Sequence, residues 1–241
     1  DALHAKMSGH GGFRHNAQSA RTVDYLEDRY DHGLGLNLTF ALRKSLLKGR
    51  VPEGFPVSPD LLPQGQVPIE AHLVDLCDRI AYLSHDLDDG LRAGMFAERE
   101  AADLSLWQDA RAACDSDNRQ RIVSEVTSLL IHDVVVTCDE ILTLAPAGER
   151  APRPRHSETM AQKAQELLSF LRARFYRAPR VLEVMERGAT RIQVAFDRLR
   201  DDPSPMSARR QRRIEEDGLE RTICDYIAGM TDRFLMKIYA E

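Results

Sequence analysis

The most informative stretch of this sequence is Glu70-Ala-His-Leu-Val-Asp-Leu-Cys-Asp-Arg-Ile-Ala-Tyr-Leu-Ser-His-Asp-Leu-Asp-Asp-Gly90. At about 100° per residue, an α-helix gathers its apolar residues into an arc of roughly 80°: Leu76, Ile80, Leu83, Leu87 and Leu91. The opposite side of the helix carries a row of acidic residues around one tyrosine: Asp75, Asp78, Tyr82, Asp86 and Asp89. The pattern predicts a long amphipathic helix that begins near residue 69 and ends near Gly90 or Gly94.

The acidic face of this helix has two interpretations. Carboxylates at i,i+4 repel each other by a few tenths of a kcal/mol per pair, so a metal ion, a basic side chain or water must compensate them. Tyr82 adds a flat ring and a hydroxyl, which suit contact with a sugar or a base. The face is therefore either one wall of a binding site or an ordinary solvated helix face.

Helical periodicity extends over almost all of the remaining chain. We expect helices over residues 16–30, 38–48, 159–177 and 180–200, two helices over 98–143 with a break at 115–118, and a pair between 205 and 240. Asn37 is the expected N-cap of the helix over 38–48. Residues 49–67 and 145–157 are rich in proline and are predicted to be loops. Since strands are not needed anywhere, the predicted fold class is all-α.

Composition excludes several classes of protein. A net charge of −5 gives no strong signal for nucleic-acid binding. The four cysteines are far apart and contain no C-x-x-C pair, which is typical of reduced thiols in a cytoplasmic protein. No apolar run is long enough to cross a membrane, and no signal-peptide pattern opens the chain. The first residues, Asp1-Ala-Leu, read as the middle of a helix, so we expect an upstream portion of the natural protein to precede them.

Four motifs occur in a fixed order along the chain: Phe13-Arg-His-Asn-Ala-Gln-Ser19, Gly35-Leu-Asn-Leu-Thr39, residues 70–90, and Asp225-Tyr-Ile-Ala-Gly-Met-Thr-Asp-Arg233. In this order they strongly resemble the deoxyguanosine-triphosphate triphosphohydrolase family of HD-domain phosphohydrolases. The resemblance covers nearly the whole chain. It implies an all-helical HD-type fold, of which residues 1–241 would be the C-terminal portion of one domain. It also implies hydrolysis of a deoxynucleoside triphosphate, dGTP or a similar nucleotide, to deoxynucleoside and triphosphate.

The resemblance assigns roles to three residues of the acidic face. Asp78 falls on the last of the family's four metal ligands, which hold a divalent ion such as Mn²⁺, Mg²⁺ or Fe²⁺. Tyr82 and Asp86 fall where the family contacts the deoxyribose, by packing and by accepting a hydrogen bond from the 3′-hydroxyl. Their i, i+4, i+8 spacing lets one helix serve metal and sugar together.

The family's other three metal ligands, a histidine and an adjacent His-Asp pair, precede the point at which this chain begins. The local dipeptides His85-Asp86 and His132-Asp133 do not align with that pair. For His132-Asp133 we expect a surface or core role. As printed, the chain would supply one ligand of four, either because it is a partial chain or because it is a degenerate relative.

Two further residues are candidate site residues by resemblance. His15 aligns with a position near the phosphates, where it could stabilise charge or transfer a proton, and is the candidate catalytic residue. Tyr176 resembles an aromatic residue beside the nucleotide. A structural role at a helix end is an equal alternative for each. The neighbouring Arg172, Arg174, Arg177 and Arg180 could meet a triphosphate or an effector nucleotide, or form a solvated basic face.

The leading hypothesis is a metal-dependent dNTP triphosphohydrolase. One alternative is a non-catalytic nucleotide-binding or regulatory protein with the same fold, and another is a purely structural helical interaction domain. The resemblance also implies a homo-oligomer and a possible dNTP effector. The motif at residues 225–233 is a family marker with an expected architectural role.

Overall fold

The computed structural model describes residues 2–30, 35–47, 51–62, 67–144 and 152–239. Within these ranges all regular elements are helical, and β-type pairing is limited to an isolated bridge between Asp28 and Gly35. The prediction of an all-α chain is confirmed. None of the described helices has the length and apolar content needed to span a membrane.

The chain divides into two compact units, which are described separately. The first unit combines Asp1–Val67 with Val184–Glu241, and the second consists of Pro68–Glu183. Helix α9 (Pro179–Asp201) is shared between them along the sequence. That the chain is a portion of one HD-type domain stays a prediction.

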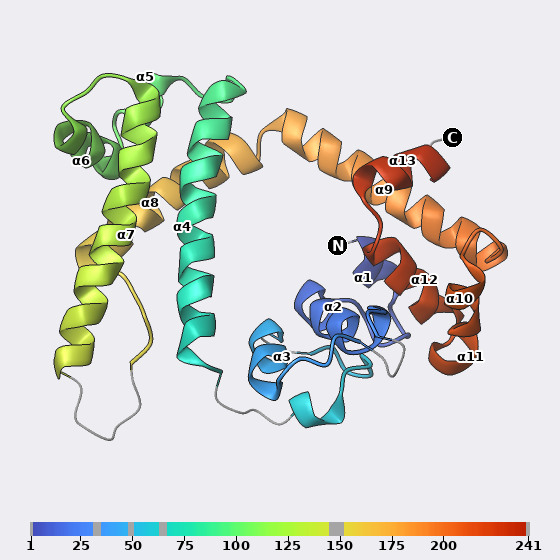
Figure 1. Ribbon diagram of the computed structural model, residues 1–241. Helices are drawn as coiled ribbons and strands as arrows, with labels where there is room; N and C mark the ends of the chain where they lie inside the picture. The colour runs from blue at the N-terminus through green and yellow to red at the C-terminus, as the bar shows by residue number, and fades with distance from the viewer. Residues whose placement is uncertain (1, 31–34, 48–50, 63–66, 145–151, 240–241) are drawn as a thin grey trace. The chain divides into compact units, whose positions relative to one another are not determined.

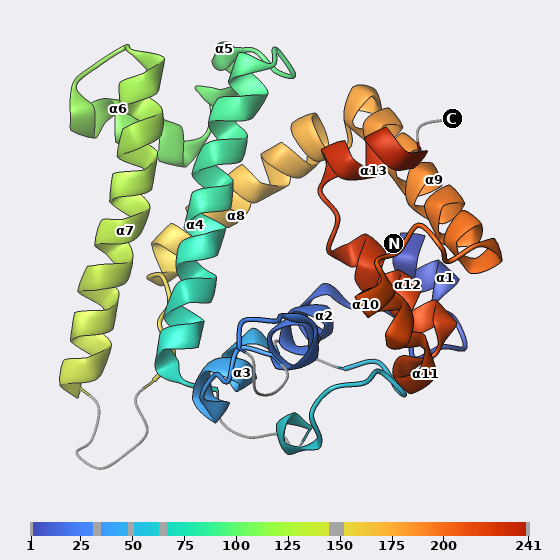
Figure 2. The same cartoon turned by 45° about the vertical axis from the view of Figure 1, so that its right-hand side comes forward.

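The second unit is a set of packed helices. In order they are α4 (Ile69–Arg92), α5 (Glu98–Ala101), α6 (Ser105–Cys114), α7 (Arg119–Leu144) and α8 (Glu158–Leu171), which continues into the π-helical segment η3 (Arg172–Tyr176). Helices α4 and α7 lie side by side in both views, and α6 packs beside α7 (Figures 1 and 2). The predicted break at residues 115–118 is confirmed: Asp115 ends α6 with a positive φ of 43°, and Asn118 caps α7.

The apolar stripe predicted for α4 forms the core of this unit. Its buried members are Ile80, Leu83, Leu87 and Leu91, while Leu76 is partly buried. They belong to one cluster with the apolar side of α7, namely Ile122, Val126, Leu130 and Val134. Burying each such side chain contributes about 1.5–3 kcal/mol, so this packing fixes the rotation of α4 and leaves its acidic face outward.

Gly90 permits a close contact at the end of α4. A Cβ atom at this position would lie 2.3 Å from the ring of Phe96, which itself meets Phe170 edge-to-face at 4.8 Å between ring centroids. Only glycine leaves room for this aromatic pair against the helix.

The first unit contains shorter helices. They are α1 (Ala2–Lys6), α2 (His15–Arg21), the π-helical segment η1 (Thr22–Leu26), α3 (Phe40–Leu46), the 3₁₀ turn η2 (Pro59–Leu61), most of α9, α10 (Ala208–Arg212), α11 (Ile214–Asp217), α12 (Leu219–Ala228) and α13 (Asp232–Tyr239). The C-terminal pair predicted between 205 and 240 is thus four helices, because turns near Arg213, Gly218 and Gly229 divide it.

Two expectations for the N-terminal segment are wrong. The helix predicted over 16–30 ends at Leu26, where the chain turns back so that Gly35 N donates to the carbonyl of Glu27. Asn37 is not the N-cap of α3, because it adopts the left-handed conformation with φ 51°. Thr39 takes that role, and its hydroxyl accepts from Leu42 N at 3.4 Å.

A buried ionic cluster lies at the centre of the first unit. Arg21, only 2% exposed, pairs with Asp225 at 2.8 Å and with Asp217 at 2.7 Å, and Gln18 donates to Asp225 at 2.8 Å. Burial opposes the charge on Arg21, but hydrogen bonds and charge from Asp225 and Asp217 outweigh it and raise the pKa of the guanidinium. The motif at residues 225–233 therefore has a structural role at its first residue.

Candidate functional site

The acidic face of α4 is the first component of the candidate site. Asp78 and Tyr82 are exposed, Tyr82 by 60%, whereas Asp86 is half-buried. The acidic face of α4 therefore points away from the core, because the apolar stripe on the other side of the helix is buried.

Two arginines pair with carboxylates of the same helix, and one of these carboxylates, Asp75, belongs to the acidic row. Arg79 pairs with Asp75 and Arg92 with Asp88, each at 2.7 Å and with i,i+4 spacing. Asp78 is different, because no described residue donates to its carboxylate or pairs with it. An exposed carboxylate without a protein partner is available to a ligand or to solvent.

The half-buried Asp86 has a partner far away in sequence. The hydroxyl of Tyr176, at the end of η3, donates a hydrogen bond to Asp86 Oδ2. Burial and the charge of Asp86 both raise the pKa of Tyr176, so the phenol stays protonated at neutral pH and acts as the donor. The structure therefore brings two of the predicted site residues, 90 positions apart, into direct contact.

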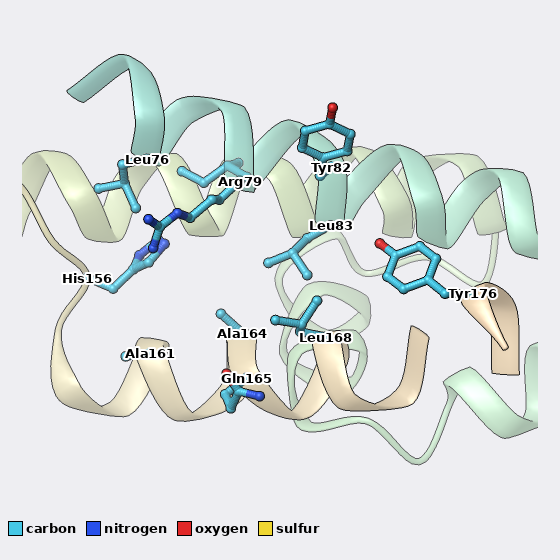
Figure 3. Close-up of a pocket in the computed structure, with 11 residues that line it drawn as sticks. Leu76, Arg79, Tyr82, Leu83, His156, Ala161, Ala164, Gln165, Leu168 and Tyr176 are labelled. Carbon is cyan, nitrogen blue, oxygen red and sulfur yellow. The ribbon is translucent and has the colours of Figure 1, made fainter. Parts of the chain in front are cut away.

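Tyr176 and Tyr82 border a pocket of about 370 Å³ between α4 and α8. Figure 3 shows Tyr176 at one end, Arg79 and His156 at the other, and the ring of Tyr82 on the rim with its hydroxyl directed away from α8. The wall between the two ends is mostly apolar: Leu76, Ile80, Leu83, Ala161, Ala164 and Leu168. Such a pocket suits a ligand with polar groups at its ends and a flat or apolar body.

His156 is a pocket residue that the sequence reasoning missed. Its Nδ1 lies 2.9 Å from Asp133 Oδ2, and Asp133 also accepts from Ser157 N at 3.0 Å and from Ser157 Oγ at 2.5 Å. Burial alone would raise the pKa of Asp133, but the hydrogen bonds from Ser157 and His156 outweigh it and lower that pKa. Ser157, the N-cap of α8, was the available sequence signal, since it places His156 just before a helix start.

Of the predicted His132-Asp133 dipeptide, His132 is exposed and Asp133 is half-buried. The expected surface role suits His132, whereas Asp133 orients His156.

His15 belongs to the first unit, as the first residue of α2. It is exposed and borders a separate pocket of about 400 Å³, together with Gln18, Thr22 and Ala228. The other four predicted site residues, Asp78, Tyr82, Asp86 and Tyr176, all lie in the second unit.

The arginines near Tyr176 are exposed. Arg174 pairs with Glu100 at 2.7 Å, and the charge of Arg172 acts to lower the pKa of Tyr176 without offsetting the rise. Their role as a phosphate or effector site stays a prediction.

The residues described in the structure do not form a metal site by themselves. No group of three or more His, Cys, Asp or Glu side chains among them is arranged to hold an ion. Asp78 alone is a hard oxygen donor suited to a divalent cation, but a single carboxylate does not fix one.

Comparison with known proteins gives three findings. Residues 155–241 match a family described as a phosphohydrolase-associated domain. A deoxyguanosinetriphosphate triphosphohydrolase-like protein of Geobacter metallireducens is 35% identical over 98% of this chain and 66% of its own length. Proteins with the same description from an Azoarcus species and from Rhodopseudomonas palustris are 33% and 34% identical, over 98% of this chain and 67% and 68% of their lengths. The chain thus spans about two thirds of the length of the curated relatives that it matches.

Proposed function

The chain belongs to the deoxyguanosinetriphosphate triphosphohydrolase-like family, and we propose that the full-length protein hydrolyses a deoxynucleoside triphosphate to deoxynucleoside and triphosphate. The observation that supports this most is the contact between Tyr176 and Asp86 beside Tyr82 at one pocket. The family resemblance assigns Tyr82 and Asp86 to the sugar and Tyr176 to a position beside the nucleotide.

Asp86 is proposed to accept a hydrogen bond from the 3′-hydroxyl of the deoxyribose. A carboxylate has two oxygens with about four lone-pair sites, and the Tyr176 hydroxyl occupies one of them. The remaining sites can take a hydroxyl donor while Tyr176 holds the carboxylate in place. Because the phenol stays protonated, it orients Asp86 without competing for the proton of the sugar.

Tyr82 is proposed to pack its ring against the deoxyribose. It stands one helical turn before Asp86, on the same side of α4, and 60% of it is exposed. A ring in van der Waals contact with C2′ leaves no room for a ribose hydroxyl, so this residue would select the deoxy sugar.

Asp78 is proposed as one ligand of a divalent cation. It lies one further turn along the same face and has no partner among the described residues. Asp78 alone does not fix an ion, so a metal site would need further ligands. When bound, such an ion polarises a phosphate oxygen and acidifies a water molecule. His15 is proposed to act near the phosphates, as a hydrogen-bond donor or proton carrier.

The test is a product analysis with full-length protein, dGTP and Mn²⁺, followed by ³¹P NMR. Tripolyphosphate as the first product supports the proposal. Monophosphate with pyrophosphate would indicate another nucleotide hydrolase, and binding without turnover would favour the non-catalytic alternative. Homo-oligomer formation and activation by a dNTP are proposed on the family resemblance alone.

A further inference from the structure

His156 is an ionisable side chain whose position in the pocket has no assigned role. Only 10% of its side chain is exposed, and its ring lines the pocket opposite α4 (Figure 3). Burying an imidazole at a pocket wall costs solvation, so its hydrogen bonds decide which atom it offers to a ligand.

The hydrogen bond to Asp133 fixes the tautomer. The Asp133 carboxylate is an acceptor, so His156 Nδ1 carries a hydrogen and donates across 2.9 Å. The other ring nitrogen, Nε2, has no partner among the described residues. A carboxylate hydrogen-bonded to one ring nitrogen holds the imidazole in place, so the opposite nitrogen points in a fixed direction.

We propose that protonated His156, oriented by Asp133, binds the phosphate chain of the nucleotide at this end of the pocket. The inference rests on the proposed function for the identity of the ligand. The geometry gives two reasons for a phosphate at this end of the pocket. Figure 3 shows the Arg79 guanidinium reaching toward His156, so two nitrogen-rich side chains converge here.

The second reason is the distance along α4. Asp86, the proposed sugar contact, lies seven residues after Arg79, which corresponds to about 10 Å of helix. A triphosphate that extends from the sugar along α4 covers this distance. It therefore ends beside Arg79 and His156, at the level of Asp78.

The neighbouring charges define the expected pH dependence. Asp133 from α7 faces His156 directly, and the other charged or titratable residues of the pocket lining are Arg79, Tyr82 and Tyr176. Burial and the hydrogen bond to Asp86 raise the pKa of Tyr176, so its phenol stays neutral between pH 6 and 8. Imidazoles in general change charge between pH 6 and 8, so phosphate binding that depends on one should weaken from pH 6 to pH 8.

The test is calorimetric titration of the full-length protein with inorganic tripolyphosphate, in buffer with a chelator, at pH 6 and pH 8. The unsubstituted protein should bind about tenfold more tightly at pH 6 than at pH 8. His156→Asn keeps a donor toward Asp133 and should reduce binding at pH 6 to the level at pH 8. The matched control is His132→Asn, which changes an exposed histidine next to Asp133 in α7. This variant should behave like the unsubstituted protein. Protonation of tripolyphosphate itself is common to all three proteins.

A second measurement keeps the test valid if His156→Asn fails to fold. In the unsubstituted protein, the imidazole NMR signals of His156 should shift when tripolyphosphate is added, with an apparent pKa that rises. Unchanged signals, or a folded His156→Asn protein with unsubstituted pH dependence, would overturn the proposal.

The two proposals fail separately. Loss of the tripolyphosphate effect with intact dGTP hydrolysis would remove His156 from the phosphate site and leave the proposed function standing. Binding that depends on His156 in a protein that hydrolyses no dNTP would refute the proposed function alone.

Discussion

Each unit contains a carboxylate that is hydrogen-bonded to other side chains, but the two carboxylates differ in burial and in their capacity to bind a ligand. Asp225 in the first unit is 3% exposed and is held by Arg21 and Gln18. Asp86 in the second unit is half-buried and accepts a hydrogen bond from Tyr176, which borders a pocket. Both belong to motifs of the family resemblance, so sequence similarity alone does not separate them. Burial and the number of free lone pairs distinguish the two carboxylates. Asp225 is buried and hydrogen-bonded to Arg21 and Gln18, whereas Asp86 can still accept a hydrogen bond from a ligand.

The largest expected effect is on the buried cluster. Asp225→Ala leaves the Arg21 guanidinium buried with only Asp217, and should reduce the free energy of unfolding by about 3–5 kcal/mol in urea denaturation. The double substitution Arg21→Met with Asp225→Leu should lose less than Asp225→Ala, because no uncompensated charge remains. A loss below about 1 kcal/mol for Asp225→Ala would contradict the structural role.

The next effect concerns Asp86 and is expected in activity rather than stability. Asp86→Asn should lower kcat/KM for dGTP by about 10- to 100-fold, the worth of a hydrogen bond to a charged group. The free energy of unfolding should change by less than about 1 kcal/mol, because Asn still accepts from Tyr176. Tyr176→Phe is the companion variant and should give a smaller loss, since it removes only the orienting hydrogen bond. Steady-state kinetics and urea denaturation on the same preparations separate the two effects.

A third prediction concerns the close contact at the end of α4 in the second unit. Gly90→Ala places a Cβ against the Phe96 ring and should destabilise the protein by about 1–3 kcal/mol. Gly188→Ala in α9 is the matched control, because nothing lies within 4 Å of its Cβ position. It should be neutral or stabilising by about 0.5–1 kcal/mol. Equal effects of the two substitutions in thermal unfolding would contradict the close contact at Gly90.

The smallest effect is the pH dependence of Asp133. Its pKa is lower in the folded protein than in the unfolded chain, so its stabilising contribution is present above the unfolded pKa near 3.8. That contribution is lost as the pH falls through the lower folded value. Asp133→Asn should therefore cost about 1 kcal/mol at pH 7, and the difference from the unsubstituted protein should shrink toward pH 3. A constant difference between pH 7 and pH 3 would show that the charge of Asp133 is not what stabilises its contacts.

The sequence predicts single helices well when one face is apolar over many turns. Helix α4 is an example, because its apolar stripe from Leu76 to Leu91 repeats over about four turns and its ends carry recognisable signals. Short helices were predicted less well. Asn37 and Thr39 are both good N-caps by residue type, and the backbone conformation at Asn37 decides between them.

The periodicity of the sequence does not predict contacts between segments that are far apart along the chain. Tyr176 and Asp86 were each found by resemblance, but their hydrogen bond depends on how α8 and η3 pack on α4. His156 had no pattern of its own in the sequence, since an isolated histidine before a helix start is common. Its position in the pocket depends on a hydrogen bond to Asp133, for which the sequence predicts only a surface or core role in a helix.

The most direct test of the central claim, that Asp86 binds the sugar 3′-hydroxyl, is a two-by-two binding experiment. The full-length protein and Asp86→Asn would each be titrated with dGTP and with 2′,3′-dideoxy-GTP under conditions without turnover. The unsubstituted protein should prefer dGTP by about 10- to 100-fold, and Asp86→Asn should bind both nucleotides with similar affinity. If Asp86→Asn retains the full preference for the 3′-hydroxyl, Asp86 does not contact it and the account of the pocket is wrong.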